Sequence, residues 1–499
     1  MRRGSITVFL SLILSASLVF VLVVTEAARY AGLRLTARQA GTTASDSLFA
    51  SFNRNLLEDY GLLFYDGGRG TESIRCELIE NDFQHYYYEN ANKSLALLGG
   101  SFFRIGRVDA DITEIITSVD YNGEIFVRSA LDFFKYDAVS ELADRIQEQL
   151  ELIRRGDYVK EASESEEDKG SLLEQLKPLE PAPSGPAQEG EEGFDQERLE
   201  DSINGSAIGA AERVRSRGWL WLALPGDKTI SGKKLNMAGL PSEAERDLRK
   251  LNDSSSVFDN ISDRVLFNEY LLAMFPCFVS ETPETGQHYQ LEYLITGKQS
   301  DDKALKSVLD KMLLTREGMN MLHIFTSTPK RTAVEELTML LVGWTGIAPL
   351  IAVVEVGLIA AWAYAESIMD MRILLSGGKV PLLKTEEDWN LHLSTLVEFF
   401  MGAETLAVQH NKGLSYEDYL RLQLFATDSH DLAYRAMDLI QTSQREINPG
   451  FTMSSQIYAM EIRTTASATE LFSALPVSAG MIGFGNTDYE WEEYYSGAY

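Results

Sequence analysis

The chain has 499 residues, enough for roughly two to four ordinary domains or for one large domain with insertions. Hydrophobic residues make up 45% and charged residues 24% of it, a balance typical of a folded protein with a sizeable core. Acidic residues outnumber basic ones by 74 to 45, and the net charge of −29 disfavours binding to nucleic acid or to anionic lipid through a basic patch.

The N-terminus is strongly apolar. Residues 5–25, SITVFLSLILSASLVFVLVVT, carry no charge over about the 20 residues that a helix needs to cross a bilayer. Arg2 and Arg3 precede this stretch and favour a cytoplasmic N-terminus with the bulk of the chain outside. A cleaved secretory signal usually has an apolar region of only about 7–15 residues, and a soluble core helix would carry a polar face. We therefore expect residues 1–25 to be an uncleaved transmembrane anchor, with a cleaved signal or a soluble core helix as the alternatives.

The helix is expected to continue beyond the anchor, over residues 26–60, and to end near Tyr60. Apolar residues recur there every three or four positions, which places them on one side of an amphipathic helix. This stripe consists of Leu33, Ala37, Ala40, Ala44, Leu48, Phe52 and Leu56. The charged residues occupy other positions and are expected to meet water: Glu26, Arg29, Arg34, Arg38, Asp46 and Arg54.

Residues 61–155 are predicted to form the N-terminal part of an α+β domain. Helical patterns cover 74–98 and 123–153, and the alternation of apolar and polar residues at 105–119 is typical of a strand. Residues 156–201 then become rich in Glu, Ser, Pro and Gly, and lack the apolar surface that would offset the entropy of ordering. We expect this segment to be an acidic disordered linker.

Residues 202–470 are predicted to form a helix-rich extracytoplasmic domain. Helices are expected at 257–275, 301–325, 331–346, 350–374, 388–411 and 415–446. Ser415 with Asp418 resembles an imperfect capping box at the start of the last of these. A strand is expected at 451–467 and is a natural partner for the strand at 105–119, and residues 471–499 are expected to be a C-terminal tail.

A second apolar stretch, Met339–Ala365, contains Glu355 as its one charge. As a second transmembrane helix it would return the last third of the chain to the cytoplasm. Pro349, however, suits the first turn of a new helix better than a helix interior. A charge at Glu355 would also cost roughly 2.5–3.5 kcal/mol near the middle of a membrane. Two consecutive buried helices are therefore the preferred interpretation.

Motifs that carry chemistry are missing from the sequence. The six histidines form no HExxH, and no GxSxG, P-loop or GxGxxG occurs, so no catalytic, cofactor-binding or metal-binding residue is predicted. Cys76 and Cys277 stand outside any CxxC and are either two separate thiols or one long-range disulfide. The abundant carboxylates leave a hydrolase with two paired acids as an alternative.

Several segments resemble a family of uncharacterised, membrane-anchored proteins associated with tight-adherence (Tad, or Flp-type) pilus systems. These segments are GSITVFLSLIL (4–14), LEYLITGKQSDDKALKSVLDKMLLTREGMNM (291–321), AWAYAESIMDMRILLSGGKVPLLKT (361–385), and LSYEDYLRLQLFA with YRAMDLIQ after it (414–441). The resemblance implies an envelope protein that works beside a pilus or secretion machine.

The opening is also similar to pseudopilins of the TadE kind, in which a short basic leader ends at Gly before a hydrophobic helix. In those proteins a prepilin peptidase cuts after the Gly, and the resemblance implies a cut between Gly4 and Ser5 here. Such pilins carry Glu at the fifth residue after the cut, whereas this chain has Phe9. The charge pairing that the Glu provides is therefore not available to this chain.

Together these observations predict a predominantly helical α+β protein: a long N-terminal transmembrane helix that continues into a helix-rich extracytoplasmic domain with a small antiparallel sheet. We expect a single-pass cell-membrane protein without enzymatic activity, an accessory or pseudopilin-like component of a Tad-type apparatus. Its expected partners are the membrane and proteins of that machine, with no nucleic acid, cofactor or identifiable small-molecule substrate. The alternatives are a membrane-anchored envelope hydrolase and an envelope-binding module.

Overall fold

The computed structural model describes residues 2–93, 102–137, 196–226, 228–249, 256–280, 286–403, 413–471 and 488–499. The chain forms two compact units, each assembled from separated segments. Unit 1 comprises residues 1–134, 239–256 and 440–499, and unit 2 comprises residues 135–238 and 257–439. Most of the expected linker lies outside the described residues, but its last part, 196–201, belongs to helix α6.

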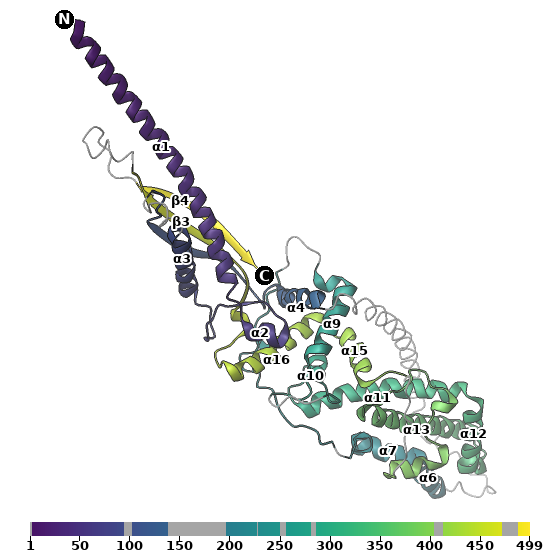
Figure 1. Ribbon diagram of the computed structural model, residues 1–499. Coiled ribbons are helices and arrows are strands. Elements are labelled where there is room, and N and C mark those ends of the chain that lie inside the picture. The colour runs from purple at the N-terminus through teal and green to yellow at the C-terminus, as the bar shows by residue number, and fades with distance from the viewer. Residues whose placement is uncertain are drawn as a thin grey trace, which may run out of the picture. The chain divides into compact units, whose positions relative to one another are not determined.

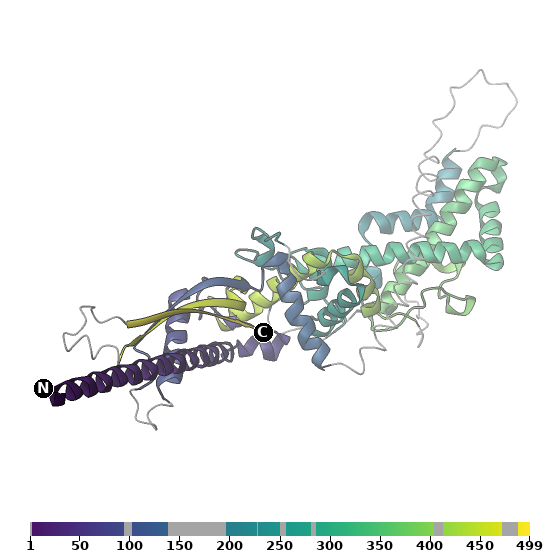
Figure 2. The same cartoon turned by 90° about the horizontal axis from the view of Figure 1, so that it is seen from above.

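Unit 1 is built on a small antiparallel sheet with helices packed against it (Figures 1 and 2). Its main elements are α1 (Arg2–Phe49), α2 (Arg54–Tyr60), β1 (Tyr65–Asp66), α3 (Cys76–Lys93), β2 (Arg107–Thr117), α4 (Glu124–Asp137), β3 (Gln456–Thr469) and β4 (Asp488–Ala498). Strand β3 lies in the middle, because β2 pairs along one of its edges and β4 along the other. The long helix and the small antiparallel sheet of the expected fold are thus confirmed, as is the pairing of the strands expected at 105–119 and 451–467.

Strand β4 lies in the segment expected to be a C-terminal tail. Its burial alternates with a period of two, with Trp491 and Tyr495 facing the core and Glu490 and Glu492 facing outward. The many acids at the outward positions lower the average hydrophobicity of the segment, so its composition resembles that of a polar tail and does not indicate a strand.

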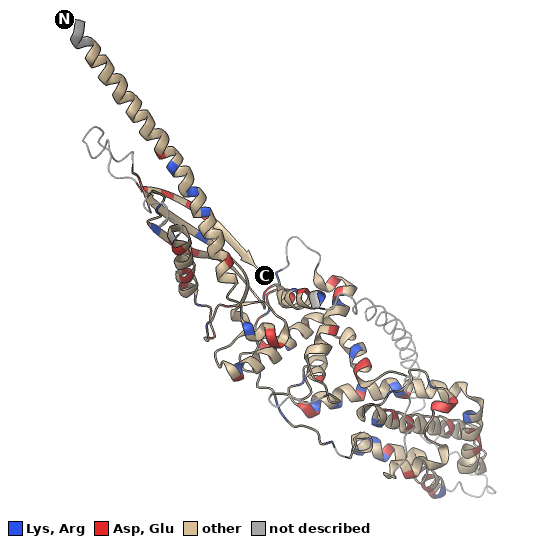
Figure 3. Cartoon of the chain, viewed as in Figure 1, with Lys and Arg blue, Asp and Glu red and all other residues tan. Residues whose placement is uncertain are grey.

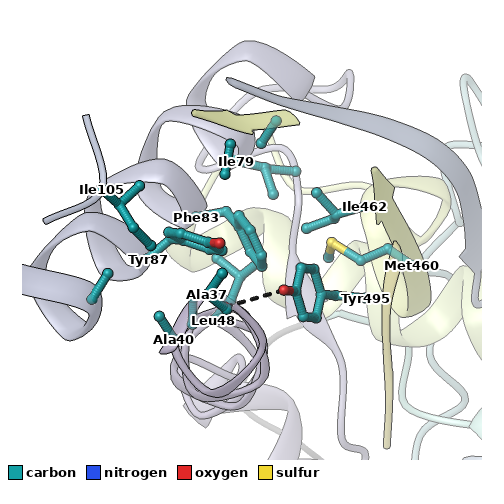
Figure 4. Close-up of a cluster of buried hydrophobic side chains, with 14 of the residues drawn as sticks. Ala37, Ala40, Leu48, Ile79, Phe83, Tyr87, Ile105, Met460, Ile462 and Tyr495 are labelled. Atoms are coloured by element: carbon teal, nitrogen blue, oxygen red, sulfur yellow. Dashed lines mark hydrogen bonds between the residues drawn. The ribbon is translucent and has the colours of Figure 1, made fainter. Parts of the chain in front are cut away.

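Helix α1 packs its C-terminal half into unit 1 and leaves its N-terminal half exposed (Figure 1). The predicted stripe is buried at all but one of its positions, Phe52, which is half-buried; the buried members are Leu33, Ala37, Ala40, Ala44, Leu48 and Leu56. Across from the stripe lie α3 and the inner face of the sheet, with Phe83, Tyr87, Ile462 and Tyr495 in one continuous core (Figure 4). The three alanines of the stripe, Ala37, Ala40 and Ala44, allow this close approach of helix and sheet.

The expected helix to Tyr60 is interrupted after Phe49. The Asn53 side chain accepts a hydrogen bond from the Leu56 amide and so caps a separate helix, α2, which Gly61 terminates with a positive φ of 66°. An Asn that bonds to nearby backbone competes with helix continuation. The backbone amide of Asn53 also donates to Phe64 O at 2.8 Å, which turns the chain toward the sheet.

Gly41 makes the α1–β4 contact possible. A Cβ atom at this position would lie 2.0 Å from Cζ of Tyr495, whose hydroxyl donates to the Ala37 carbonyl at 3.2 Å. We predict that Gly41→Val lowers the free energy of unfolding of the detergent-solubilised chain by about 2 kcal/mol, since the added methyl groups overpack the core.

The matched control for this substitution is Thr42→Val, on the exposed side of the same helix, for which a change of less than about 0.5 kcal/mol is expected. In a double-mutant cycle, Tyr495→Leu should recover part of the loss caused by Gly41→Val. Equal effects of the Gly41 and Thr42 variants in denaturant unfolding would contradict this packing.

Unit 2 is helical. Its helices are α6 (Gln196–Asn204), α7 (Ala207–Arg217), α8 (Leu220–Ala223), α9 (Ile261–Met274), α10 (Gln290–Thr296), α11 (Asp301–Thr326), α12 (Thr328–Val342), α13 (Ala348–Leu375), α14 (Leu396–Phe400), α15 (Tyr416–Ala426) and α16 (Ser429–Ile447), whose last turns belong to unit 1. The helices expected at 301–325 and 350–374 are confirmed nearly to the residue.

Two expected helices of unit 2 are wrong in extent. The segment expected as one helix at 415–446 is divided, because the Asp428 side chain accepts from the amides of His430 and Asp431 and starts α16. Ser415 and Asp418 do form a complete capping box at the start of α15. Of the helix expected at 388–411, only α14 and a 3-10 turn are seen, residues 404–411 lying outside the described part of the chain.

The second apolar stretch consists of two helices, as expected, but it is not wholly buried, since Met339 and Leu340 at the end of α12 are exposed. Pro349 sits in the first turn of α13, and the chain turns through Gly343–Thr345 just before it. The C-terminal half of α13 is buried against α11, α7 and α8, while its N-terminal turns are partly exposed. By length and apolarity alone α13 could cross a membrane, but a core helix passes the same test.

Candidate functional site

The exposed half of α1 is the first candidate. Every large apolar side chain that it carries between Ile6 and Val24, apart from the half-buried Leu22, is exposed, and its most apolar window has a mean hydropathy of 2.7. The hydroxyls of Ser11, Ser15 and Thr25 donate to carbonyls three or four residues earlier, at 2.7 to 2.9 Å. With these groups bonded internally, the helix could span a membrane.

Past the arginines at its start, charge appears on α1 only from Glu26 onward, where the helix meets the sheet (Figure 3). Glu26 and Arg29 were expected to face water, but this is wrong for both, since each is buried. Arg29 Nη1 donates to Glu26 Oε1 at 2.9 Å, and Arg29 Nε donates to Phe102 O at 2.5 Å. The sequence pattern of α1 cannot reveal this, because the covering residue, Phe102, is far along the chain.

The second candidate is a buried charge cluster in unit 2, made by Arg316, Asn320, Glu366, Asp370 and Lys384. Arg316 Nε and Asn320 Nδ2 donate to Asp370 Oδ2 at 2.9 and 3.1 Å. Lys384 Nζ lies 2.5 Å from Asp370 Oδ1 and also contacts Glu366. Two cations thus face two carboxylates in a region without solvent.

The two cations of this cluster control the protonation of Asp370. Burial by itself would raise the pKa of Asp370, but Lys384 and Arg316 beside it hold that pKa below its usual range. Glu366 further accepts from the amides of Asn390 and Leu391 at 3.0 and 2.9 Å. Its carboxylate therefore ties the loop after α13 to the helix.

The cluster is bordered by His323, which stacks on Trp389 with ring centroids 5.1 Å apart. Its Nε2 lies 3.6 Å from Glu386 Oε1, and Lys330 contacts the same carboxylate. Burial, with the help of Lys330, lowers the pKa of His323. The neutral imidazole fits a packing role, as the apolar neighbours of His323 in the sequence indicate.

Another buried acid, Glu292 on α10, makes no ion pair with the residues that the structure describes. Its Oε1 accepts from the Tyr416 hydroxyl at 2.7 Å and from the Phe278 amide at 2.9 Å. Its other oxygen, Oε2, has no hydrogen-bond partner within the described parts of the chain. Burial raises the pKa of Glu292 from 4.5 to about 7.

These buried acids do not form an accessible catalytic pair. Glu292, Glu366 and Asp370 are fully enclosed, so a polymer substrate cannot reach them in this structure. Two other acids, Glu114 and Glu461, line an open groove of about 300 Å³ on the outer face of the sheet. The Thr113 hydroxyl donates to the Glu461 carboxylate there at 3.1 Å.

The residues singled out from the sequence are not brought together. The backbone of Gly4 and Ser5 lies in the first turns of α1, and cleavage between them stays a prediction. Cys76 at the start of α3 and the buried Cys277 are free thiols in separate units. Burial raises the pKa of the Cys277 thiol, which makes it a poor nucleophile.

Residues 197–468 match the model of a protein family of unknown function, DUF5702. The chain belongs to the DUF5702 family. The match covers more than half of the chain and runs from α6 to the end of β3, so the DUF5702 region takes in the described helices of unit 2 from α6 onward. A search of curated proteins and a search of solved structures each gave no match.

Proposed function

We propose that this chain is a non-enzymatic, membrane-anchored component of a Tad/Flp-type pilus or secretion apparatus, either a pseudopilin-like subunit or an accessory protein. One observation carries the proposal: a single helix, α1, has an exposed apolar half and a half packed into an antiparallel sheet. This layout is how pilin-like proteins begin, and the opening GSITVFLSLIL resembles the same systems.

The proposed topology places the N-terminus in the cytoplasm and both compact units outside it, in the cell envelope. Arg2 and Arg3 precede the apolar half of α1 and support this orientation. The net charge of −29 keeps the rest of the chain away from an anionic inner leaflet.

The bonding of the buried acids in unit 2 supports a structural role for this unit. The buried acids of unit 2 bond to neighbouring side chains and amides and are closed to solvent, as Asp370 and Glu366 illustrate. Such groups rigidify a scaffold and do not present themselves to a substrate.

The test is affinity capture of an epitope-tagged full-length chain from native membranes, with intact-mass and N-terminal sequencing of the recovered protein. We expect a pilus or secretion component in the captured material, and loss of pilus display when the gene is deleted. A chain that begins at Ser5 would favour the pseudopilin form, and one that begins at Met1 the permanent accessory. Normal display in the deletion strain would contradict the proposal.

Complementation of the deletion strain distinguishes our proposal from the hydrolase alternative. Chains that carry Glu114→Gln or Glu461→Gln should restore pilus display as well as the native chain does, because neither acid has a chemical role in our proposal. Failure of both variants at normal protein level would favour catalysis in the groove that these acids line.

A further inference from the structure

Two loop ends of unit 1 close over α1 where its exposed apolar half ends. Phe102, just before β2, accepts from Arg29 through its carbonyl at 2.5 Å. Leu471, just after β3, donates its amide to Glu26 Oε1 at 3.5 Å. Because both residues are bonded to α1, the depth of α1 in a bilayer fixes their depth as well.

The uncharged exposed surface of α1 is longer than the hydrocarbon core of a membrane. Glu26 and Arg29 are buried and paired, so the first exposed charge after the anchor is Arg34. From Ile6 to Leu33 the helix is about 42 Å long at 1.5 Å per residue. A bilayer core is about 30 Å thick, and about 40–45 Å with its headgroup layers. With Ile6 at the inner edge of the core, about 12 Å of this surface remains, and these last two turns lie in the outer headgroup layer.

Aromatic side chains surround α1 at this level. Tyr30 packs on Tyr489 with ring centroids 4.8 Å apart, and Phe102 packs on Phe103 at 4.9 Å. Phe102 and Leu471 are each 38% exposed. Tyrosine rings such as Tyr30 and Tyr489, apolar with one polar hydroxyl, concentrate at membrane interfaces, and the exposed Phe102 and Leu471 add apolar surface beside them.

We propose that this collar, defined as Tyr30, Phe102, Phe103, Leu471 and Tyr489, is a lipid-binding surface. It sits in the outer headgroup layer of the bilayer that α1 spans, with Phe102 and Leu471 against phospholipid. The inference rests on the membrane anchor in the proposed function and adds the part of unit 1 that touches lipid. Unit 1 then lies directly on the membrane at a fixed depth, and not at a distance from the membrane surface.

The charges beside the collar are of both signs. Arg104 and Arg107 are exposed next to Phe102, and Asp488 and Glu490 are exposed at the start of β4. Contact should therefore depend on the apolar side chains and persist in purely zwitterionic lipid.

Depth-dependent fluorescence quenching tests the collar. The full-length chain, with Cys76→Ser and Cys277→Ala, would carry an environment-sensitive fluorophore at Phe102→Cys, in phosphatidylcholine vesicles with bromines at different acyl depths. We expect blue-shifted emission, with a greater loss of intensity from bromines near the glycerol than from bromines near the chain end.

Two further positions serve as controls. Leu18→Cys lies in the anchor and should be quenched most strongly by deep bromines. Tyr494→Cys, 57% exposed on β4 and about 17 Å further along the strand than Tyr489, should not be quenched.

The outcomes separate the two proposals. Quenching at position 18 but not at position 102 would overturn the collar and leave the anchor intact. No quenching at either position would overturn the anchor itself. Should the cysteine-free chain fail to fold, a photoreactive benzoylphenylalanine at position 102 of the native chain should give a lipid adduct by mass spectrometry, and its absence, with an adduct at position 18, would again reject the collar.

Discussion

Replacing Asp370 with Asn is expected to destabilise unit 2 by about 3–5 kcal/mol, because it leaves buried cations without their partner. Arg316 and Lys384 both contact the Asp370 carboxylate and are completely buried or nearly so. Asn has the size of Asp but no charge, and its amide would point a further donor at these cations. Urea unfolding of the detergent-solubilised chain at pH 7, followed by the loss of helical circular dichroism, measures the change.

The control for Asp370→Asn is Glu335→Gln. Glu335 lies 3.5 Å from Arg331 in a half-exposed pair one turn apart on α12, and such pairs contribute about 0.5 kcal/mol or less. If both substitutions lowered the unfolding free energy equally, the cluster would owe its stability to something other than charge pairing.

Replacing Glu292 with Gln should stabilise the protein at pH 8 and leave it nearly unchanged near pH 4. The folded-state pKa of Glu292 is about 7, above the usual 4.5, so folding favours the protonated carboxyl. Its stabilising contribution is present below about pH 4.5 and is lost as the pH rises through about 7. Gln stays neutral throughout, and its oxygen can keep the bonds from Tyr416 and Phe278. A gain of up to about 3 kcal/mol at pH 8 is expected from this shift.

The matched control for Glu292→Gln is Glu269→Gln, another buried acid of unit 2. Glu269 Oε1 accepts from Arg421 Nε at 2.8 Å, so removal of its charge should destabilise the protein at pH 8. Unfolding free energies measured from pH 4 to pH 8 distinguish the two. A Glu292→Gln variant that is less stable than the native chain at pH 8 would show that the fold stabilises the charged carboxylate, and would contradict the raised pKa.

Local patterns predicted much of the architecture. The stripe from Leu33 to Leu56 is almost wholly buried, since spacings of three and four residues define one side of any helix. Pro349 in the first turn of α13 and the capping box at Ser415 were readable because they depend on neighbours within four residues. The same short range explains the errors at Asn53 and Asp428, whose capping bonds outweighed a continuing apolar pattern.

The sequence by itself determined the long apolar N-terminal helix, its amphipathic continuation, the helical character of the described part of unit 2 and the two strands that pair. Each depends on periodicity or composition within a short window. Only the tertiary structure decided the burial of Glu26 and Arg29, the enclosure of Glu292, the charge cluster around Asp370 and the place of β4 in the sheet. Those features join residues tens to hundreds of positions apart, and the free energy of a buried charge depends on neighbours that no local pattern specifies.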